Sequence, residues 1–118
     1  MEARKKRAWI YAHIDAPDDS HGMLDRQYEQ LNSYADRMGF EVIGNSSDVG
    51  GGDTLLRPGL QSFLDESGNG MIEALLVADS TRISCDTARR KEFVKQMEEC
   101  WIEVFSPEEG EIHSDDAI

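Results

Sequence analysis

Residues 8–19 read AWIYAHIDAPDD, and this stretch decides the fold because an apolar strand runs directly into a charged loop. Trp9, Ile10, Tyr11 and Ile14 are the aromatic and β-branched residues that strands favour. Their nearly continuous apolar character is typical of a strand covered on both faces. The stretch predicts the opening unit of an open α/β sheet, in which residues 12–19 form one wall of any site.

The rest of the chain alternates helical and extended patterns. Apolar residues three and four apart predict a helix over residues 23–38, capped by Asp19 or Ser20 at its start and by Gly39 at its end. Two further helices are expected, one over residues 57–66 with Pro58 in its first turn and one over residues 87–99. Strands are expected over residues 40–44, 71–78 and 101–105. A long loop is expected over residues 45–56. This order predicts an α/β fold, a three-layer, mostly parallel sheet of four to five strands.

Composition limits the classes of function. The 118 residues suit one domain, 8–112, with a flexible basic arm at 1–7 and an acidic tail at 113–118. The net charge of -12 disfavours non-specific binding to nucleic acid, which needs cations against phosphates. The longest apolar run, 74–78, is too short to span a membrane, and two cysteines make no disulfide scaffold. We expect a cytoplasmic protein without a membrane partner or a cofactor.

Carboxylates gather where the first and third strands are expected to end. Asp15, Asp18, Asp19 and Asp79 are oxygen ligands that can together hold a divalent cation. Carboxylates at these two positions also occur in receiver-type phosphoryl-transfer domains. The same residues are typical of a solvated loop, which is the interpretation we favour.

Nucleophiles occur in the loop at residues 79–86. Ser80, Thr81 and Ser84 are hydroxyl nucleophiles, and His13 is the base that the topology can bring near them. Cys85 lies near Arg82 in sequence, which would suit a reactive thiol of lowered pKa. We favour the alternative that it is an ordinary cysteine. Neither of the usual glycine-rich phosphate-binding motifs is present.

Five short motifs occur in a fixed order over about residues 7–112. They are IYA at 10–12, DRQ at 25–27 with QL at 30–31, SD at 47–48 leading into LLRPGL at 55–60, RISCDT at 82–87, and EGEI at 109–112. Together they resemble the N-terminal catalytic domain of serine site-specific recombinases, the resolvases and invertases of mobile DNA elements. In that family a serine attacks a DNA phosphate and forms a phosphoseryl bond, and a cage of arginines stabilises the developing charge.

The resemblance implies a site whose residues are mostly substituted. It places Asp15 at the nucleophilic serine and His13 at the arginine two residues before it. The other substituted positions are Asp19 near the family's glutamine, Gly51 at the serine of the mobile loop, Thr81 at an aspartate and Cys85 at a second arginine. Arg57 and Arg82 alone keep the family's residue type, so they are the candidates for binding an anion or DNA.

The resemblance therefore implies a pseudoenzyme of DNA recombination. Such a domain does not cut DNA, binds it weakly or not at all, and acts as an interaction or regulatory module, as a homodimer or bound to an active recombinase. One alternative is a small enzyme in which Asp15, Asp19 and Asp79 bind a metal while Arg57 and Arg82 hold an anionic substrate. Another is an accessory protein that binds DNA through a basic arm at residues 4–7.

Overall fold

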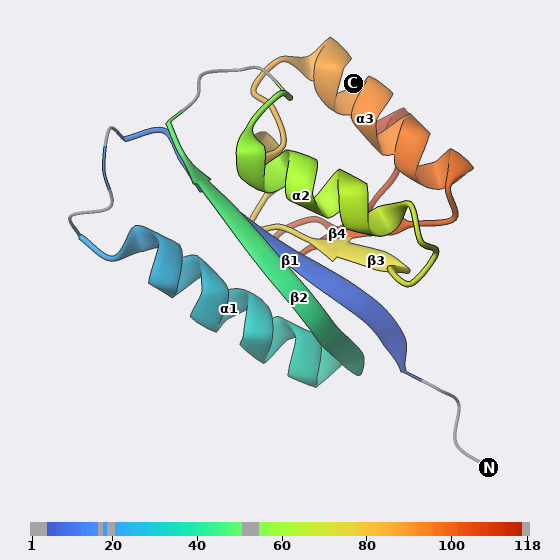
Figure 1. Ribbon diagram of the computed structural model, residues 1–118, viewed down its shortest axis with the longest axis horizontal. Coiled ribbons are helices and arrows are strands. Elements are labelled where there is room, and N and C mark those ends of the chain that lie inside the picture. Colours follow the sequence, from blue (N-terminus) through green and yellow to red (C-terminus); the bar gives the residue numbers. More distant parts are fainter. Residues whose placement is uncertain (1–4, 17, 19–20, 51–54, 117–118) are drawn as a thin grey trace.

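The computed structural model describes residues 5–16, 18, 21–50 and 55–116 (Figure 1). The elements follow in the order β1 (Lys6–Ile14), α1 (Met23–Met38), β2 (Phe40–Val49), α2 (Pro58–Ser67), β3 (Ala74–Leu76), the 3-10 turn η1 (Ser80–Arg82), α3 (Thr87–Glu99), β4 (Glu103–Ser106), β5 (Gly110–Ile112) and the 3-10 turn η2 (Ser114–Asp116). The sheet order is β2-β1-β3-β4-β5, with the first four strands parallel and β5 antiparallel to β4. The predicted α/β class and the mostly parallel sheet are confirmed.

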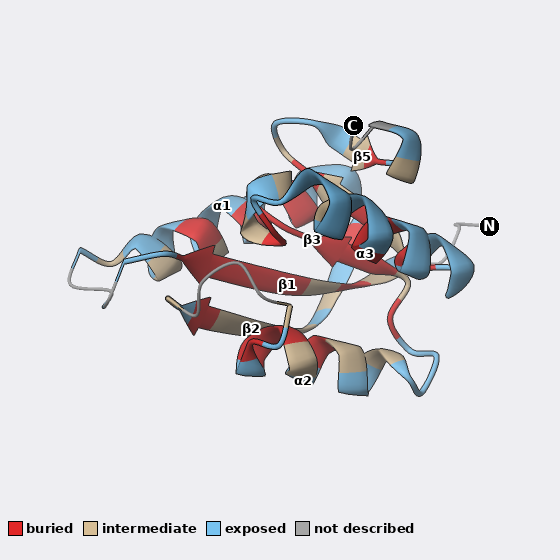
Figure 2. Cartoon of the chain, turned by 90° about the horizontal axis from the view of Figure 1, so that it is seen from above, coloured by how far each residue is buried: buried red, intermediate tan, exposed pale blue. Residues whose placement is uncertain are grey.

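Two apolar layers enclose the sheet, and β1 contributes to both. On one face, Ile10 and neighbouring side chains pack against Leu31 and Ala35 of α1. On the other face, Tyr11 packs with residues of α2 and α3, among them Phe63 and Phe93. Figure 2 shows β1 buried along most of its length, as the nearly continuous apolar sequence predicted. Because β1 lies between β2 and β3, its carboxyl end is flanked by the carboxyl ends of both neighbouring strands.

The second strand is longer than its sequence suggested. β2 continues to Val49 and pairs with β1 as far as Ile14, so residues 45–49 belong to the sheet and the expectation of a loop from residue 45 was wrong. Polar residues of 45–48 concealed the strand. The register shifts between Ala8 and Trp9, and Gly44 lies under the Trp9 ring, where an added Cβ would fall 2.3 Å from a ring carbon. The extension carries Asp48 to the carboxyl edge.

Several element ends also differ from expectation. β1 begins at Lys6, so Lys6 and Arg7 are strand residues and not part of a flexible arm; they form ion pairs with Glu103 and Glu73. α1 is capped by Gly22 with φ of 67°, so neither Asp19 nor Ser20, both outside the described residues, is its N-cap. β3 is shorter than residues 71–78, and β4 begins two residues later than the predicted 101.

The first part of the acidic tail is structured as well. Ser114–Asp116 form η2, and the Ser114 amide donates to a Glu98 carboxylate oxygen over 3.3 Å. The segment is therefore attached to α3. The described helices include none with the length and apolar character needed to cross a membrane.

Candidate functional site

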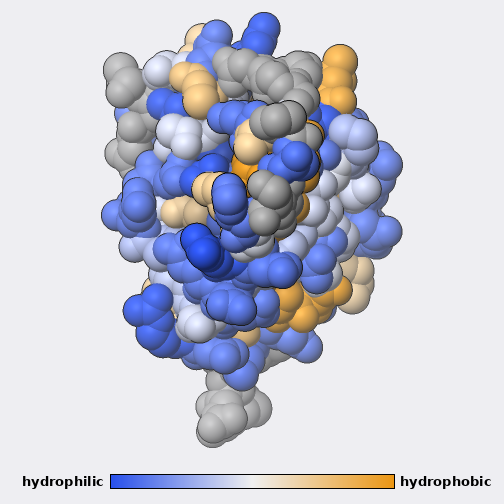
Figure 3. Space-filling view, turned by 90° about the vertical axis from the view of Figure 1, so that its left-hand side faces the viewer, coloured by the Kyte–Doolittle hydropathy of each residue, from blue (hydrophilic) through white to orange (hydrophobic). Residues whose placement is uncertain are grey.

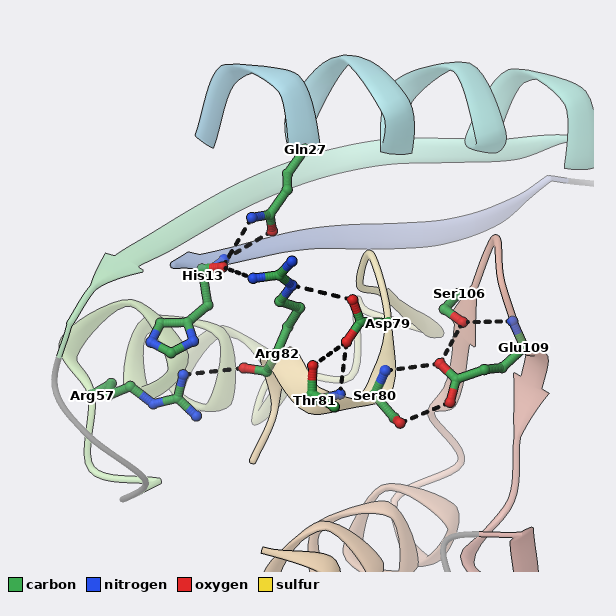
Figure 4. A network of polar contacts seen from close by, with 9 residues as sticks. All are labelled: His13, Gln27, Arg57, Asp79, Ser80, Thr81, Arg82, Ser106 and Glu109. Carbon is green, nitrogen blue, oxygen red and sulfur yellow. Dashed lines mark hydrogen bonds and ion pairs between the residues drawn. The ribbon is translucent and has the colours of Figure 1, made fainter. Parts of the chain in front are cut away.

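Polar side chains converge where β1 and β2 end, beside the start of α2 and the turn η1. Figure 3 faces this end of the molecule and shows a mostly hydrophilic surface with small hydrophobic patches. Figure 4 shows the contacts beneath it, which connect β1, α1, η1 and the β4–β5 turn. This is the carboxyl edge at which the sequence placed the site.

Asp48 is a buried carboxylate that joins β1, β2 and α2. One oxygen accepts from the Gly59 amide over 2.8 Å; the other accepts from the Leu60 amide over 3.0 Å and from the Tyr11 hydroxyl over 2.7 Å. Backbone N–H groups in the first turn of a helix lack partners within the helix, and a negative charge there is favourable. Asp48 thus serves as the cap of α2, although it is distant in sequence.

Arg57 is turned inward and is only 2 % exposed. Its guanidinium donates over 3.0 Å to the Tyr11 hydroxyl, over 3.1 Å to the backbone oxygen of Arg82, and also to the backbone oxygen of Ile83. Arg57 therefore attaches the loop after β3 to the start of α2. Its hydrogen-bonding capacity is largely spent on the protein itself.

Tyr11 lies between these two charges. Burial and the hydrogen bond to Asp48 raise the pKa of the Tyr11 hydroxyl far above its usual range, although the positive charge of Arg57 acts in the opposite direction. The native state therefore keeps this proton at a pH at which an unfolded tyrosine releases it.

This shift predicts a loss of stability in alkali. Above about pH 10 the unfolded chain releases the Tyr11 proton while the native state retains it, so the free energy of unfolding falls by up to about 1.4 kcal/mol per pH unit. Tyr11→Phe should remove this contribution to the slope in urea titrations between about pH 9 and 11. Burial also raises the pKa of Tyr34, so Tyr34→Phe should reduce the slope as well and tests the same effect at a second site. An unchanged slope in Tyr11→Phe would contradict the assignment.

Arg82 holds the turn η1 against the end of β1. Its Nη1 donates to the backbone oxygen of His13 over 2.9 Å, and its Nε lies 3.3 Å from an Asp79 carboxylate oxygen (Figure 4). Asp79 also accepts from the Thr81 amide over 3.0 Å and from the Thr81 hydroxyl. The Asp79 side chain thereby caps η1. The Gln27 side chain donates to the same His13 oxygen over 2.9 Å and accepts from the His13 amide over 3.1 Å.

His13 and Asp15 lie at the very end of β1. The His13 ring is 4 % exposed, stacks on Tyr11 and donates from Nε2 to the Gly50 backbone oxygen over 2.9 Å. Asp15 is different, because its side chain is 72 % exposed, with one carboxylate oxygen 3.6 Å from His13 Nε2. The edge therefore presents a carboxylate to solvent and keeps its cationic side chains beneath.

The predicted nucleophiles have structural partners. The Ser80 amide and hydroxyl donate to Glu109 over 2.8 and 2.7 Å, and the Ser106 hydroxyl donates to the same carboxylate over 2.8 Å (Figure 4). Ser84 is buried and its hydroxyl oxygen accepts from the Asp86 amide over 3.0 Å. Cys85 is exposed and takes part in no disulfide. These contacts fasten η1 to the β4–β5 turn and do not pair a serine with His13.

The remaining predicted positions do not complete a metal site. Among residues 5–16, 18, 21–50 and 55–116, no group of three His, Cys, Asp or Glu side chains is placed to hold a metal ion. Asp79 is engaged with Thr81 and Arg82. Asp19 and Gly51 lie outside the described residues.

Sequence reasoning missed the residues that organise this edge. Asp48 and Glu109 entered only as parts of the motifs that carry the resemblance, although each accepts three hydrogen bonds. Gln27 is a buried polar residue on the inner face of α1. Its position beside an apolar stripe is a signal that could have found it, since buried polar groups need partners.

Comparisons with known proteins agree with this architecture. Residues 15–118 match the family model "Resolvase, N terminal domain". The N-terminal catalytic domain of TP901-1 integrase is similar, with a TM-score of 0.81 and 26% identity over 89% of this chain and 80% of that one. The C-terminal catalytic domain of ISC1926 TnpA, an IS607-like serine recombinase, gives a TM-score of 0.77 and 21% identity over 85% of this chain and 68% of that one.

A third solved structure shares the fold at lower identity. A resolvase family site-specific recombinase from Streptococcus pneumoniae gives a TM-score of 0.75 and 16% identity over 90% of this chain and 74% of that one. The family model covers most of the chain, and it begins at Asp15, the exposed carboxylate at the end of β1. The chain therefore belongs to the resolvase N-terminal domain family, with the sheet, the three helices and the polar edge described above.

Proposed function

We propose that this protein is a resolvase-like domain of DNA recombination that does not cleave DNA and that acts by associating with itself or with an active recombinase. The observation that carries the proposal is the orientation of the two arginines at the carboxyl edge. Arg57 is buried and donates to backbone oxygens and to Tyr11, while Arg82 is bound to His13 and Asp79. Both side chains support the fold of the edge.

Electrostatics at Asp15 supports the same conclusion. Transfer of a phosphoryl group requires cations around the phosphate, because negative charge spreads over its oxygens. An exposed carboxylate at the end of β1 repels a phosphate that approaches this position. Removing one preorganised donor from an active site typically costs about 3 kcal/mol of transition-state stabilisation. The substitutions that the resemblance implies at His13 and Cys85 would add to this loss.

A cleavage assay tests the inactivity. We expect the purified protein to form no covalent adduct with supercoiled plasmid DNA and to leave its topology unchanged, while an active serine recombinase on its own plasmid yields both products. The contrary result is a protein–DNA adduct that disappears in Ser80→Ala or Ser84→Ala. Such an adduct would show that a serine of the η1 loop has replaced the family's nucleophile.

Association is tested separately by sedimentation. We expect self-association, or a complex with the catalytic domain of an active serine recombinase accompanied by a changed yield of recombination. A protein that stays monomeric and leaves the recombinase unaffected would refute the interaction module. The metal-dependent alternative gains no support from the described residues, since Asp79 is bound to Arg82.

A further inference from the structure

A cavity of about 440 Å³ lies away from the carboxyl edge, between α3, the start of β1 and the β4–β5 pair. Its floor is apolar and consists of Val94, Ile102, Val104 and Ile112. All four are buried core residues that close the cavity toward the protein interior. None of the carboxyl-edge residues described above lines it.

Trp101 forms part of the wall and is unusual in two respects. It is 90 % exposed, and it is the one non-glycine residue in the described part of the chain with a positive φ, of 61°. The left-handed conformation is unfavourable for a bulky side chain, and an exposed indole leaves apolar surface in water. Both features oppose stability at the end of α3, where a glycine would adopt the left-handed conformation without strain. Local features that oppose stability are expected at functional sites.

The rim of the cavity is anionic. It carries four glutamates and one lysine, Glu73, Glu98, Glu103, Glu111 and Lys6. Lys6 pairs with Glu103 and Arg7 with Glu73, while His113 lies 3.7 Å from both Glu98 and Glu111. The hydrogen bond from Ser114 holds the pKa of Glu98 below its usual range, which keeps this carboxylate ionised. The carboxylates still outnumber the cations of this rim, which disfavours a phosphate and favours a cation near Glu98 and Glu111.

We propose that this cavity, the Trp101 pocket, docks a protein segment that carries an arginine or lysine next to an apolar side chain. The face of a tryptophan ring attracts a cation, and carboxylates can bind the charged head of the same side chain. The apolar floor accepts the neighbouring apolar side chain or the methylene stem of the cation. This assignment adds the chemistry of a partner to the proposed function, but it rests on the cavity and not on the inactivity of the carboxyl edge.

The test uses the whole chain and two short peptides at low salt. The first peptide is Leu-Lys-Arg-Leu and the second, with reversed charge, is Leu-Glu-Glu-Leu; binding is followed by the indole N–H resonances of Trp9 and Trp101. We expect the basic peptide to shift the Trp101 resonance in a saturable, salt-sensitive way, and the acidic peptide to leave it unchanged. Trp9 lies on another part of the sheet and donates to Ser46, so its resonance is an internal control.

Variants locate the binding. We expect Trp101→Gly to lower the affinity for the basic peptide about fivefold or more, because the cation–π contact is lost. This variant relieves the left-handed backbone, so it should melt no lower than the parent. Glu98→Gln should weaken binding as well, while Met38→Ala, which truncates an exposed apolar side chain at the end of α1, should not.

Three results would overturn the proposal. They are the absence of saturable shifts with the basic peptide, equal binding of the acidic peptide, and undiminished binding to Trp101→Gly. Trp101 shifts that depend on protein concentration without any peptide would assign the pocket to a second copy of the chain and would also refute it. None of these outcomes bears on the plasmid assay, so failure of the pocket and failure of the proposed function are distinguishable.

Discussion

Replacing Asp48 with alanine is expected to lower the free energy of unfolding by about 3–5 kcal/mol, the range found when one partner of a buried charged network is removed. The change leaves the Tyr11 hydroxyl and the amides of Gly59 and Leu60 without their acceptor. It also removes the negative charge at the start of α2 and leaves Arg57 buried beside Tyr11. Urea unfolding monitored by circular dichroism measures the loss.

Two further variants distinguish the loss of the Asp48 hydrogen bonds from a general effect of substitution in β2. Asp48→Asn keeps the shape and one acceptor oxygen, so its effect should lie between those of the parent and alanine. Asn45→Ala changes an exposed residue of the same strand and should stay within about 0.5 kcal/mol of the parent. An Asp48→Ala protein as stable as Asn45→Ala would mean that the buried carboxylate does not organise the edge.

Gly59→Ala is expected to destabilise the protein by about 3 kcal/mol, at the upper end of the usual cost of overpacking. An added Cβ would fall 2.3 Å from the Ser47 backbone oxygen and 2.9 Å from an Asp48 carboxylate oxygen. Backbone atoms of β2 cannot yield without disturbing their pairing with β1, so α2 must move away from the sheet. Thermal unfolding should show a fall in Tm of about 10 °C for a domain of this size.

Gly68→Ala is the matched control, because Gly68 lies at the other end of the same helix. Its φ of -66° is helical and the closest atom to an added Cβ is the Asp65 oxygen at 3.3 Å. We expect a change below about 1 kcal/mol, since alanine suits this conformation. Equal losses in the two variants would refute the view that the close approach of α2 to β2 is responsible.

These variants probe one arrangement, in which side chains at the carboxyl edge of the sheet stabilise the fold of that edge. Arg57 and Arg82 bind backbone oxygens of η1 and β1, and Glu109 gathers Ser80 and Ser106. The exposed charge at the end of β1 is the carboxylate of Asp15. Most of the polar contacts at this edge are therefore made within the protein itself.

Local pattern in the sequence determined much of the fold. The apolar stripe defined α1 over residues 23–38, Pro58 marked the start of α2, and the apolar strand before Asp15 predicted a buried β1. Such features depend on residues within a few positions of one another, which periodicity records directly. The five ordered motifs identified the family for the same reason, since they preserve spacing along the chain.

The tertiary structure alone decided the length of β2 and the role of each polar side chain. Residues 45–48 are polar, and they form a strand because each of them pairs with a residue of β1. Arg57 reaches Ile83 across 26 positions, and Arg82 reaches His13 across 69. A sequence specifies that these charges exist, but their partners follow from contacts between distant segments. Whether an arginine faces a ligand or the protein's own backbone is therefore settled only when the sheet and helices have packed.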